Sequence, residues 1–168
     1  RAAPVDGKMN VEHAVNGLAR GLDNWFYNAK ATTKYRYVDE EWKKETTYFK
    51  GQWGICQDNY GRLVFNSNSD HFRVEPIPSE YLQRNPFHRG ATYSIQPLPN
   101  QIVWPGRMNP GVNRAYKPGF LRLDGTMQRF TGASSLAIYR GTHFPPEFLG
   151  DVFVPEPCGN LVRRDDVS

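Results

Sequence analysis

The chain has 168 residues, of which 39% are hydrophobic, 14% aromatic and 23% charged. A chain of this length and composition can bury a sizeable core, which excludes a disordered chain and favours one folding unit. The formal net charge is +4, but the basic residues are scattered among acids, so we expect no nucleic-acid partner. No apolar run approaches about 18 residues, so we expect no membrane span.

The first fifty residues predict a four-stranded meander. The 15 glycines and 13 prolines are spread along the chain and apolar residues show almost no helical spacing, so the sequence predicts an all-β protein. In this region, short runs rich in aromatic and β-branched residues alternate with turn residues. The predicted strands span residues 17–22, 25–28, 34–38 and 42–48.

A second unit repeats the pattern of the first. Predicted strands 53–57 and 62–66 flank a turn in which Asp58 opens the turn and Gly61 supplies a positive φ. The unit therefore contains a predicted β-hairpin.

The spacing of the units indicates a repeat. Asn28 and Asn66, which close equivalent strands in the first two units, lie 38 residues apart. A third unit predicts strands 135–139 and 150–154 around the loop 140–149. A period near forty residues in an all-β chain is typical of β-propeller blades.

We therefore predict a partial β-propeller over residues 1–168, with about three four-stranded blades and a long Pro- and Asn-rich insertion. The insertion is expected to be ordered, because long loops in compact domains are usually functional. A closed propeller needs about twice as many blades, so we expect the chain to be a fragment. The blades are expected at residues 10–50, 51–73 and 120–164, and the insertion at 74–119.

The chain has two cysteines, Cys56 and Cys158, and no C-x-x-C spacing. This arrangement predicts neither a zinc knuckle nor a haem c attachment site in this chain. The two residues either form a disulfide or stay free, and the sequence favours two free thiols.

Three groups of motifs resemble one family of propeller enzymes. His13 lies five residues before Leu18, in a segment that leads into the turn and strand at 21–27. Residues 50–55 precede a second strand of this kind, and residues 132–139 begin a third. In this order, the motifs resemble the quinoprotein glucose/sorbosone dehydrogenases. The strings at residues 52–55, 66–70, 109–113 and 156–163 resemble more narrowly the large, often haem c-bearing dehydrogenase-like proteins of planctomycetes and verrucomicrobia.

The resemblance implies a sugar or alcohol dehydrogenase that uses pyrroloquinoline quinone (PQQ). His13 falls on the family's catalytic base, a role that suits a neutral imidazole. Lys50 takes the place of a cofactor-facing arginine, and Lys50 and Gln52 are expected to contact the quinone. Lysine keeps the charge of arginine but loses its planar fork. A loop histidine that caps a turn and a solvated surface lysine are the alternatives for His13 and Lys50.

The resemblance also implies a calcium ion beside the quinone. Asn66, Asn68 and Asp70 belong to a run of five oxygen-bearing side chains, which suits a hard cation. Ordinary turn chemistry explains the same run without a metal. His71, His88 and His143 are too far apart in sequence to indicate a zinc site, so we expect ordinary surface or turn histidines and no role for them.

Two functions follow from these observations. In the first, the chain is part of a periplasmic or extracellular bacterial dehydrogenase that oxidises a sugar or alcohol and passes electrons to a cytochrome. In the second, it is a non-catalytic propeller module that binds carbohydrate or protein, with Trp53, Trp104 and Tyr116 as stacking surfaces.

Overall fold

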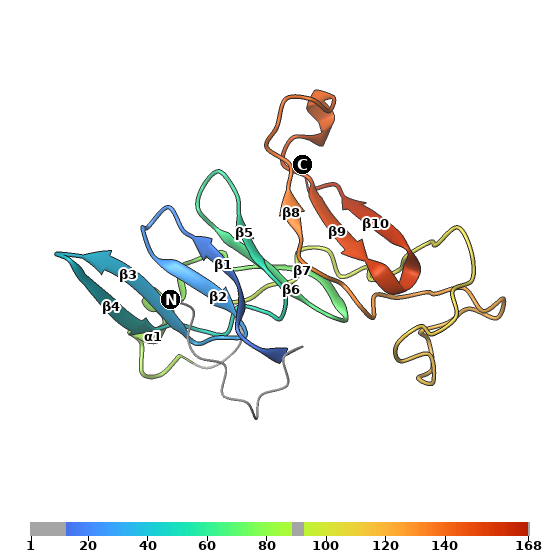
Figure 1. Ribbon diagram of the computed structural model, residues 1–168, viewed down its shortest axis with the longest axis horizontal. Helices are drawn as coiled ribbons and strands as arrows, with labels where there is room; N and C mark the ends of the chain where they lie inside the picture. Colours follow the sequence, from blue (N-terminus) through green and yellow to red (C-terminus); the bar gives the residue numbers. More distant parts are fainter. Residues whose placement is uncertain (1–12, 89–92, 168) are drawn as a thin grey trace.

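The computed structural model describes residues 13–88 and 93–167, and it is an all-β structure with almost no helix (Figure 1). The strands form three small antiparallel sheets that follow one another along the chain. The all-β prediction is therefore confirmed. Among the described residues, no helix is long and apolar enough to cross a membrane.

The first sheet is the predicted four-stranded meander, with strand order β1-β2-β3-β4. On β2, Tyr27 and Ala29 are buried and Phe26 and Asn28 are half-buried, because alternate residues of a strand point to opposite faces. β4 is exposed along its whole length, because it forms an outer edge of the sheet. The strands are β1 (Asn16–Arg20), β2 (Phe26–Ala29), β3 (Thr33–Val38) and β4 (Glu41–Thr46).

The second sheet is built on the predicted hairpin. Asp58 Oδ1 accepts the backbone N–H groups of Tyr60 and Arg62 at 2.9 Å each, and Gly61 has φ +79°, so the predicted turn is confirmed. Residues 66–70, the run of oxygen-bearing side chains, end β6, form a tight turn and begin β7, a strand that the sequence did not predict. The strands are β5 (Ile55–Gln57), β6 (Leu63–Ser67) and β7 (Asp70–Val74).

The third sheet has strand order β10-β9-β8. The loop between β8 and β9 projects from the sheet at the top of Figure 1 and carries a short turn of 3₁₀-helix, Pro146–Phe148. The second and third sheets have three strands each rather than the four expected of a blade. The strands are β8 (Ala137–Ile138), β9 (Val152–Glu156) and β10 (Leu161–Asp165).

The first strands of successive sheets lie beside one another. β1 contacts β5, β5 contacts β8, and Figure 1 shows the three strands in a row near the centre. A Cβ on Gly17 would lie 2.5 Å from Gly54 Cα, and a Cβ on Gly54 would lie 2.4 Å from Ser135 Oγ. Gly17 and Gly54 also have positive φ, 63° and 55°, which favours glycine. The three sheets therefore approach one another through their smallest residues.

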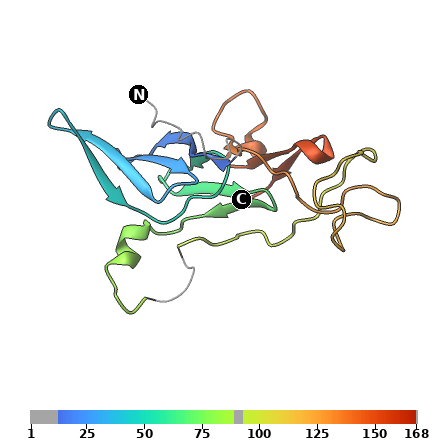
Figure 2. The same ribbon diagram turned by 60° about the horizontal axis from the view of Figure 1, so that its bottom comes forward.

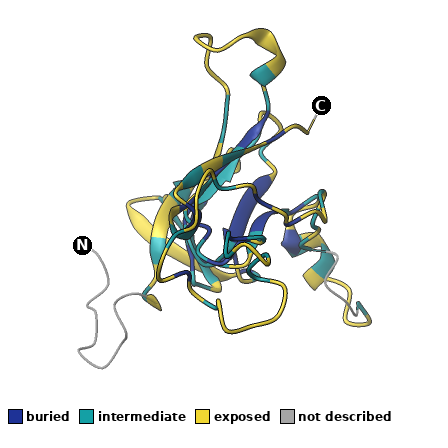
Figure 3. Ribbon diagram, turned by 90° about the vertical axis from the view of Figure 1, so that its right-hand side faces the viewer, coloured by how far each residue is buried: buried dark blue, intermediate teal, exposed yellow. Residues whose placement is uncertain are grey.

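Two apolar clusters fill the space between the sheets, and the buried stretches lie in the middle of the molecule (Figure 3). Trp25, Tyr27 and Leu63 form the smaller one, between the first and second sheets. The larger one packs the second and third sheets against the chain that connects them. It comprises Val64, Phe72, Val103, Val112, Met127, Phe130, Ala133, Leu136, Val152 and Val154.

The insertion runs along one side of the sheets (Figure 2) and begins with α1 (Ser79–Gln83). Val103 and Val112 belong to the larger core cluster, so this part of the chain is packed against the sheets, as an ordered insertion requires. Cys56 and Cys158 are free thiols, as predicted.

Candidate functional site

The first strands of the three sheets begin at one edge, which we call the shared rim and define as residues 13–17, 50–54 and 133–135. Polar side chains connect its three loops. Asn16 Nδ2 donates a hydrogen bond to the backbone oxygen of Gln52 at 2.9 Å. Asn66 Nδ2 donates to the backbone oxygen of Ser134 at 2.6 Å. Side-chain hydrogen bonds therefore tie the rim segments of all three sheets to one another.

His13 and Gln52 meet on the shared rim. His13 is exposed, and its Nδ1 lies 3.3 Å from Nε2 of Gln52. The predicted base and one predicted cofactor contact are therefore brought together, although they lie 39 residues apart in the sequence. If the Gln52 amide N–H donates to Nδ1 of His13, the ring proton lies on Nε2. If the amide is turned by 180°, its oxygen accepts from Nδ1–H, and Nε2 is then free to take a proton.

Asn16 holds these two loops together, and sequence reasoning assigned it no role. Its Nδ2 also donates to the backbone oxygen of Ala14 at 3.0 Å, and its Oδ1 accepts the N–H of Gly54 at 3.2 Å. Asn16 is thus a positioning residue for His13. The Asn-Gly pair at 16–17, which begins β1, is the sequence signal that could have identified it.

Lys50 points away from the shared rim into the protein. Its side chain is 1% exposed, and Nζ lies 2.5 Å from Glu75 Oε2 and 3.3 Å from Ser79 Oγ. Burial lowers the pKa of Lys50, and the charge of Glu75 opposes this effect. Lys50 is therefore neither a solvated surface lysine nor a cation free to meet a quinone, because its ammonium is occupied inside the fold.

The three predicted calcium ligands also serve the fold. Asn68 Oδ1 accepts a hydrogen bond from the indole N–H of Trp53. Asp70 accepts from Arg73 Nε at 2.8 Å and from Gln96 Nε2 at 3.2 Å. Asn66 is completely buried; its amide nitrogen donates to the backbone oxygen of Ser134, in the segment before β8, and its Oδ1 has no hydrogen-bond partner among the described residues.

These residues do not fit a calcium site. Hard cations need about six to eight oxygens, and the run offers one buried oxygen that no protein group occupies. In the described part of the chain, no three His, Cys, Asp or Glu side chains gather in a way that could hold a metal. Lys50 does not fit a quinone site either, because the carboxylates of the quinone require a free cation and the Lys50 ammonium is paired with Glu75.

A groove of about 380 Å³ lies where the insertion meets β10. Trp104 lines it and is 78% exposed, with the guanidinium of Arg122 3.9 Å from its ring centre. Arg163, also in the lining, donates to the backbone oxygen of Asn100 at 2.8 Å. Tyr116 is 81% exposed, outside the groove lining, whereas Trp53 is half-buried.

The fold and the shared rim define an all-β protein whose small sheets follow one another and meet at one edge. The chain belongs to the family described as Domain of unknown function (DUF7133), whose model matches residues 5–168. No curated protein and no solved structure matches it significantly.

Proposed function

We propose that the three sheets are successive blades of a β-propeller. In that fold each blade is an antiparallel meander, and the first strands of neighbouring blades lie side by side around an axis. The contacts from β1 to β5 and from β5 to β8, together with the close approach of Gly17, Gly54 and Ser135, support this arrangement. The shared rim would then surround one mouth of the propeller axis.

We further propose that the chain is part of a sugar or alcohol dehydrogenase in which His13 is the base. The observation that carries this proposal is the contact between His13 and Gln52 on the shared rim, at 3.3 Å. Oxidation of an alcohol carbon requires loss of the hydroxyl proton as hydride leaves. His13 Nε2 would take that proton when the Gln52 amide accepts from Nδ1–H. The exposed position of His13 leaves room for a substrate hydroxyl beside it.

The hydride acceptor needs a binding site other than the residues first assigned to it. A quinone is the acceptor that the family resemblance implies, and Gln52 is the one predicted contact whose side chain lies on the rim. Lys50, Asn66, Asn68 and Asp70 are used inside the fold, so the chain's own contribution is the handling of the proton.

The test is dye-linked oxidation of a panel of sugars and alcohols by the full-length protein, with PQQ and calcium supplied. We expect turnover to fall at least about 100-fold in His13→Gln, the lower end of what a general base contributes. His143→Gln is the matched control, because His143 is an exposed loop histidine outside the shared rim. Absence of turnover in the wild type, or equal turnover in both variants, would refute the assignment.

A second candidate function is carbohydrate binding by the insertion, and the exposed Trp104 beside its groove favours it. An indole of this kind can pack against the apolar face of a sugar. Binding of oligosaccharides, followed by tryptophan fluorescence, should be lost in Trp104→Ala. Oligosaccharide binding should persist in Trp42→Ala, which removes another exposed tryptophan, on β4 of the first sheet. Equal binding by both variants would argue against this groove.

A further inference from the structure

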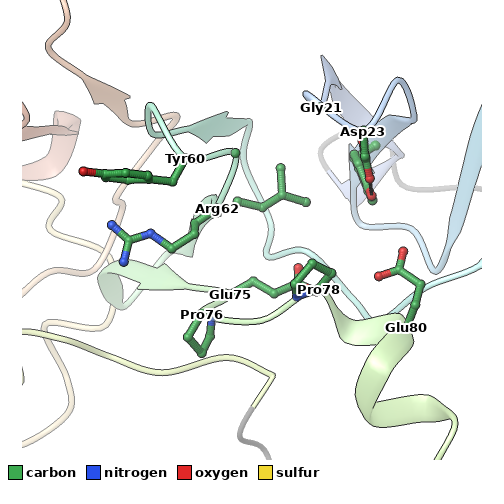
Figure 4. A pocket seen from close by; sticks show the side chains of 11 residues that line it. Gly21, Asp23, Tyr60, Arg62, Glu75, Pro76, Pro78 and Glu80 are labelled. Atoms are coloured by element: carbon green, nitrogen blue, oxygen red, sulfur yellow. Dashed lines mark hydrogen bonds between the residues drawn. The ribbon is translucent and has the colours of Figure 1, made fainter.

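Charged side chains lie at both interfaces between the sheets. At the first interface, Lys50 pairs with Glu75 and Lys34 pairs with Glu80. Glu75 and Glu80 also line a pocket of about 310 Å³ (Figure 4), and the Glu80 side chain is 25% exposed, so solvent reaches this interface. The charges between the first and second sheets are therefore paired and lie beside solvent.

The second interface holds a histidine and a carboxylate that solvent does not reach. His71, predicted as a surface or turn histidine, instead lies on β7 of the second sheet, and Asp165 ends β10 of the third. Their side chains are at most 1% exposed, and His71 Nε2 lies 3.8 Å from Asp165 Oδ2. Phe130, from the chain that connects the two sheets, stacks on the imidazole with 5.7 Å between the ring centres. The imidazole is thus enclosed where the second and third sheets meet.

The polar surroundings of His71 are incomplete. Neither of its ring nitrogens has a hydrogen-bond partner among the described residues, and the same holds for Asp165 Oδ2. Arg163 Nε, also on β10, lies 2.7 Å from Asp165 Oδ1. Asp70, the neighbour of His71 on β7, also acts on the ring, and Arg73 pairs with it at 2.8 Å. Both nearby carboxylates are therefore already matched by arginines, so a positive charge on His71 would be without a counterion of its own.

These surroundings favour the neutral imidazole. Burial lowers the pKa of His71 below its ordinary value of 6.5, and the Gln101 side chain and the Asp165 carboxylate oppose this effect. A protonated ring carries N–H groups on both nitrogens, and Nδ1–H would have no acceptor among the described residues. A buried charge and a buried donor without a partner both cost free energy, and this cost falls only when water reaches the ring.

The direction of the pH effect follows from proton binding. Below pH 6.5, a form in which water reaches His71 binds a proton that the closed form does not, so acid favours opening of the interface. Asp165 acts the other way. Burial raises its pKa above 3.8, so the closed form takes up a proton there before an open form does. Removal of the Asp165 charge therefore separates the two effects.

We propose that His71 and Asp165 form an acid-sensitive lock between the second and third sheets. At neutral pH, the uncharged ring of His71 packs against Phe130 beside the ion pair of Asp165 with Arg163, and the sheets stay in contact. At mildly acidic pH, His71 takes up a proton, its charge is solvated only when the contact opens, and the third sheet separates from the second.

The test is hydrogen exchange followed by mass spectrometry on the full-length protein, between about pH 7.5 and pH 5.5, with rates corrected for the intrinsic effect of pH. In the wild type, the opening equilibrium of β9 and β10 should rise by up to about tenfold per pH unit below 6.5, the limit for one proton. β2 and β3 of the first sheet are the internal reference and should not respond. His71→Gln should abolish the response, and His143→Gln, at an exposed loop histidine, should keep it.

Two further measurements keep the proposal open to refutation. Asp165→Asn removes the opposing effect, so acid should open the third sheet more strongly in this variant than in the wild type. NMR titration of the histidine ring signals in the wild type measures His71 directly, even where a variant does not fold. Titration of His71 at or above pH 6.5, an equal response in His71→Gln and the wild type, or an equal response in the first sheet would overturn the proposal.

Discussion

Replacement of Lys50 by methionine should destabilise the protein strongly. Methionine fills much the same volume but leaves Glu75, whose side chain is 4% exposed, without its cation. Removing one partner of a buried ion pair typically costs about 3–5 kcal/mol, because a charge stays buried without compensation. This is a large part of the roughly 5–15 kcal/mol that stabilises most domains.

Chemical denaturation followed by tryptophan fluorescence measures this loss. Lys43→Met is the matched control, because Lys43 pairs with Glu41 at 3.3 Å on the surface and its side chain is 49% exposed. An exposed pair of this kind is worth at most about 1 kcal/mol. The double variant Lys50→Met/Glu75→Gln should recover a substantial part of the loss, since it removes the unpaired charge and keeps an acceptor for Ser79. A loss below about 1 kcal/mol in Lys50→Met would refute a buried ion pair here.

The pH dependence of stability gives an independent check on Lys50. Burial lowers its pKa in the folded protein below the ordinary value of 10.5. Between the pKa of Lys50 in the folded protein and its value in the unfolded chain, the unfolded chain binds more protons than the folded one. The contribution of Lys50 to the free energy of unfolding therefore increases as pH rises toward 10.5. The difference in stability between the wild type and Lys50→Met should therefore grow over that window. A difference that shrinks as pH rises would show the opposite sign.

Three further predictions concern other parts of the fold. Gly17→Ala should lower the free energy of unfolding by about 2–5 kcal/mol, because a side chain at φ +63° is strained and its Cβ would lie 2.5 Å from Gly54 Cα. The control, Gly106→Ala, has nothing within 4 Å of the added Cβ and should change stability by less than about 1 kcal/mol. Equal losses of stability in the two variants, measured in denaturant melts, would contradict the packing of the sheets. Burial raises the pKa of Cys56 to about 12, so its alkylation at pH 8, followed by mass spectrometry, should be on the order of 1,000-fold slower in the folded protein than in urea; comparable rates would show that the thiol is not buried. Because the oxygens of Asp70 are occupied by Arg73 and Gln96, the wild type and Asp70→Asn should show the same change in Tm when EGTA removes calcium; a calcium-dependent Tm in the wild type alone would place a metal there.

Much of the strand arrangement could be predicted from local patterns. The first sheet and the β5–β6 hairpin have short runs of aromatic and apolar residues between turns with clear chemistry, such as Asp58 and Gly61, and these are found where expected. β7 was missed because its five residues include Asp70, His71 and Arg73, which read as loop residues. His71 is completely buried in that strand, and only the tertiary packing explains its place.

The candidate site was predictable only in part, for a physical reason. His13 and Gln52 sit on loops at the starts of neighbouring strands, so the repeat itself brings them to the same rim. The direction in which a side chain leaves a loop is not encoded locally. Lys50 lies two residues from Gln52 yet points into the core, because Glu75 and Ser79, from a later segment, provide its partners.

The most direct test of His13 as the base is the pH dependence of kcat/KM for sugar oxidation in the wild type and in Gln52→Glu. A carboxylate next to the ring stabilises the imidazolium, so the pH at which activity rises should move upward in the variant. A merely structural contact would change activity without moving that pH. If the two profiles rise at the same pH, or if the wild type shows no rise that depends on His13, the proposed role of this histidine is wrong.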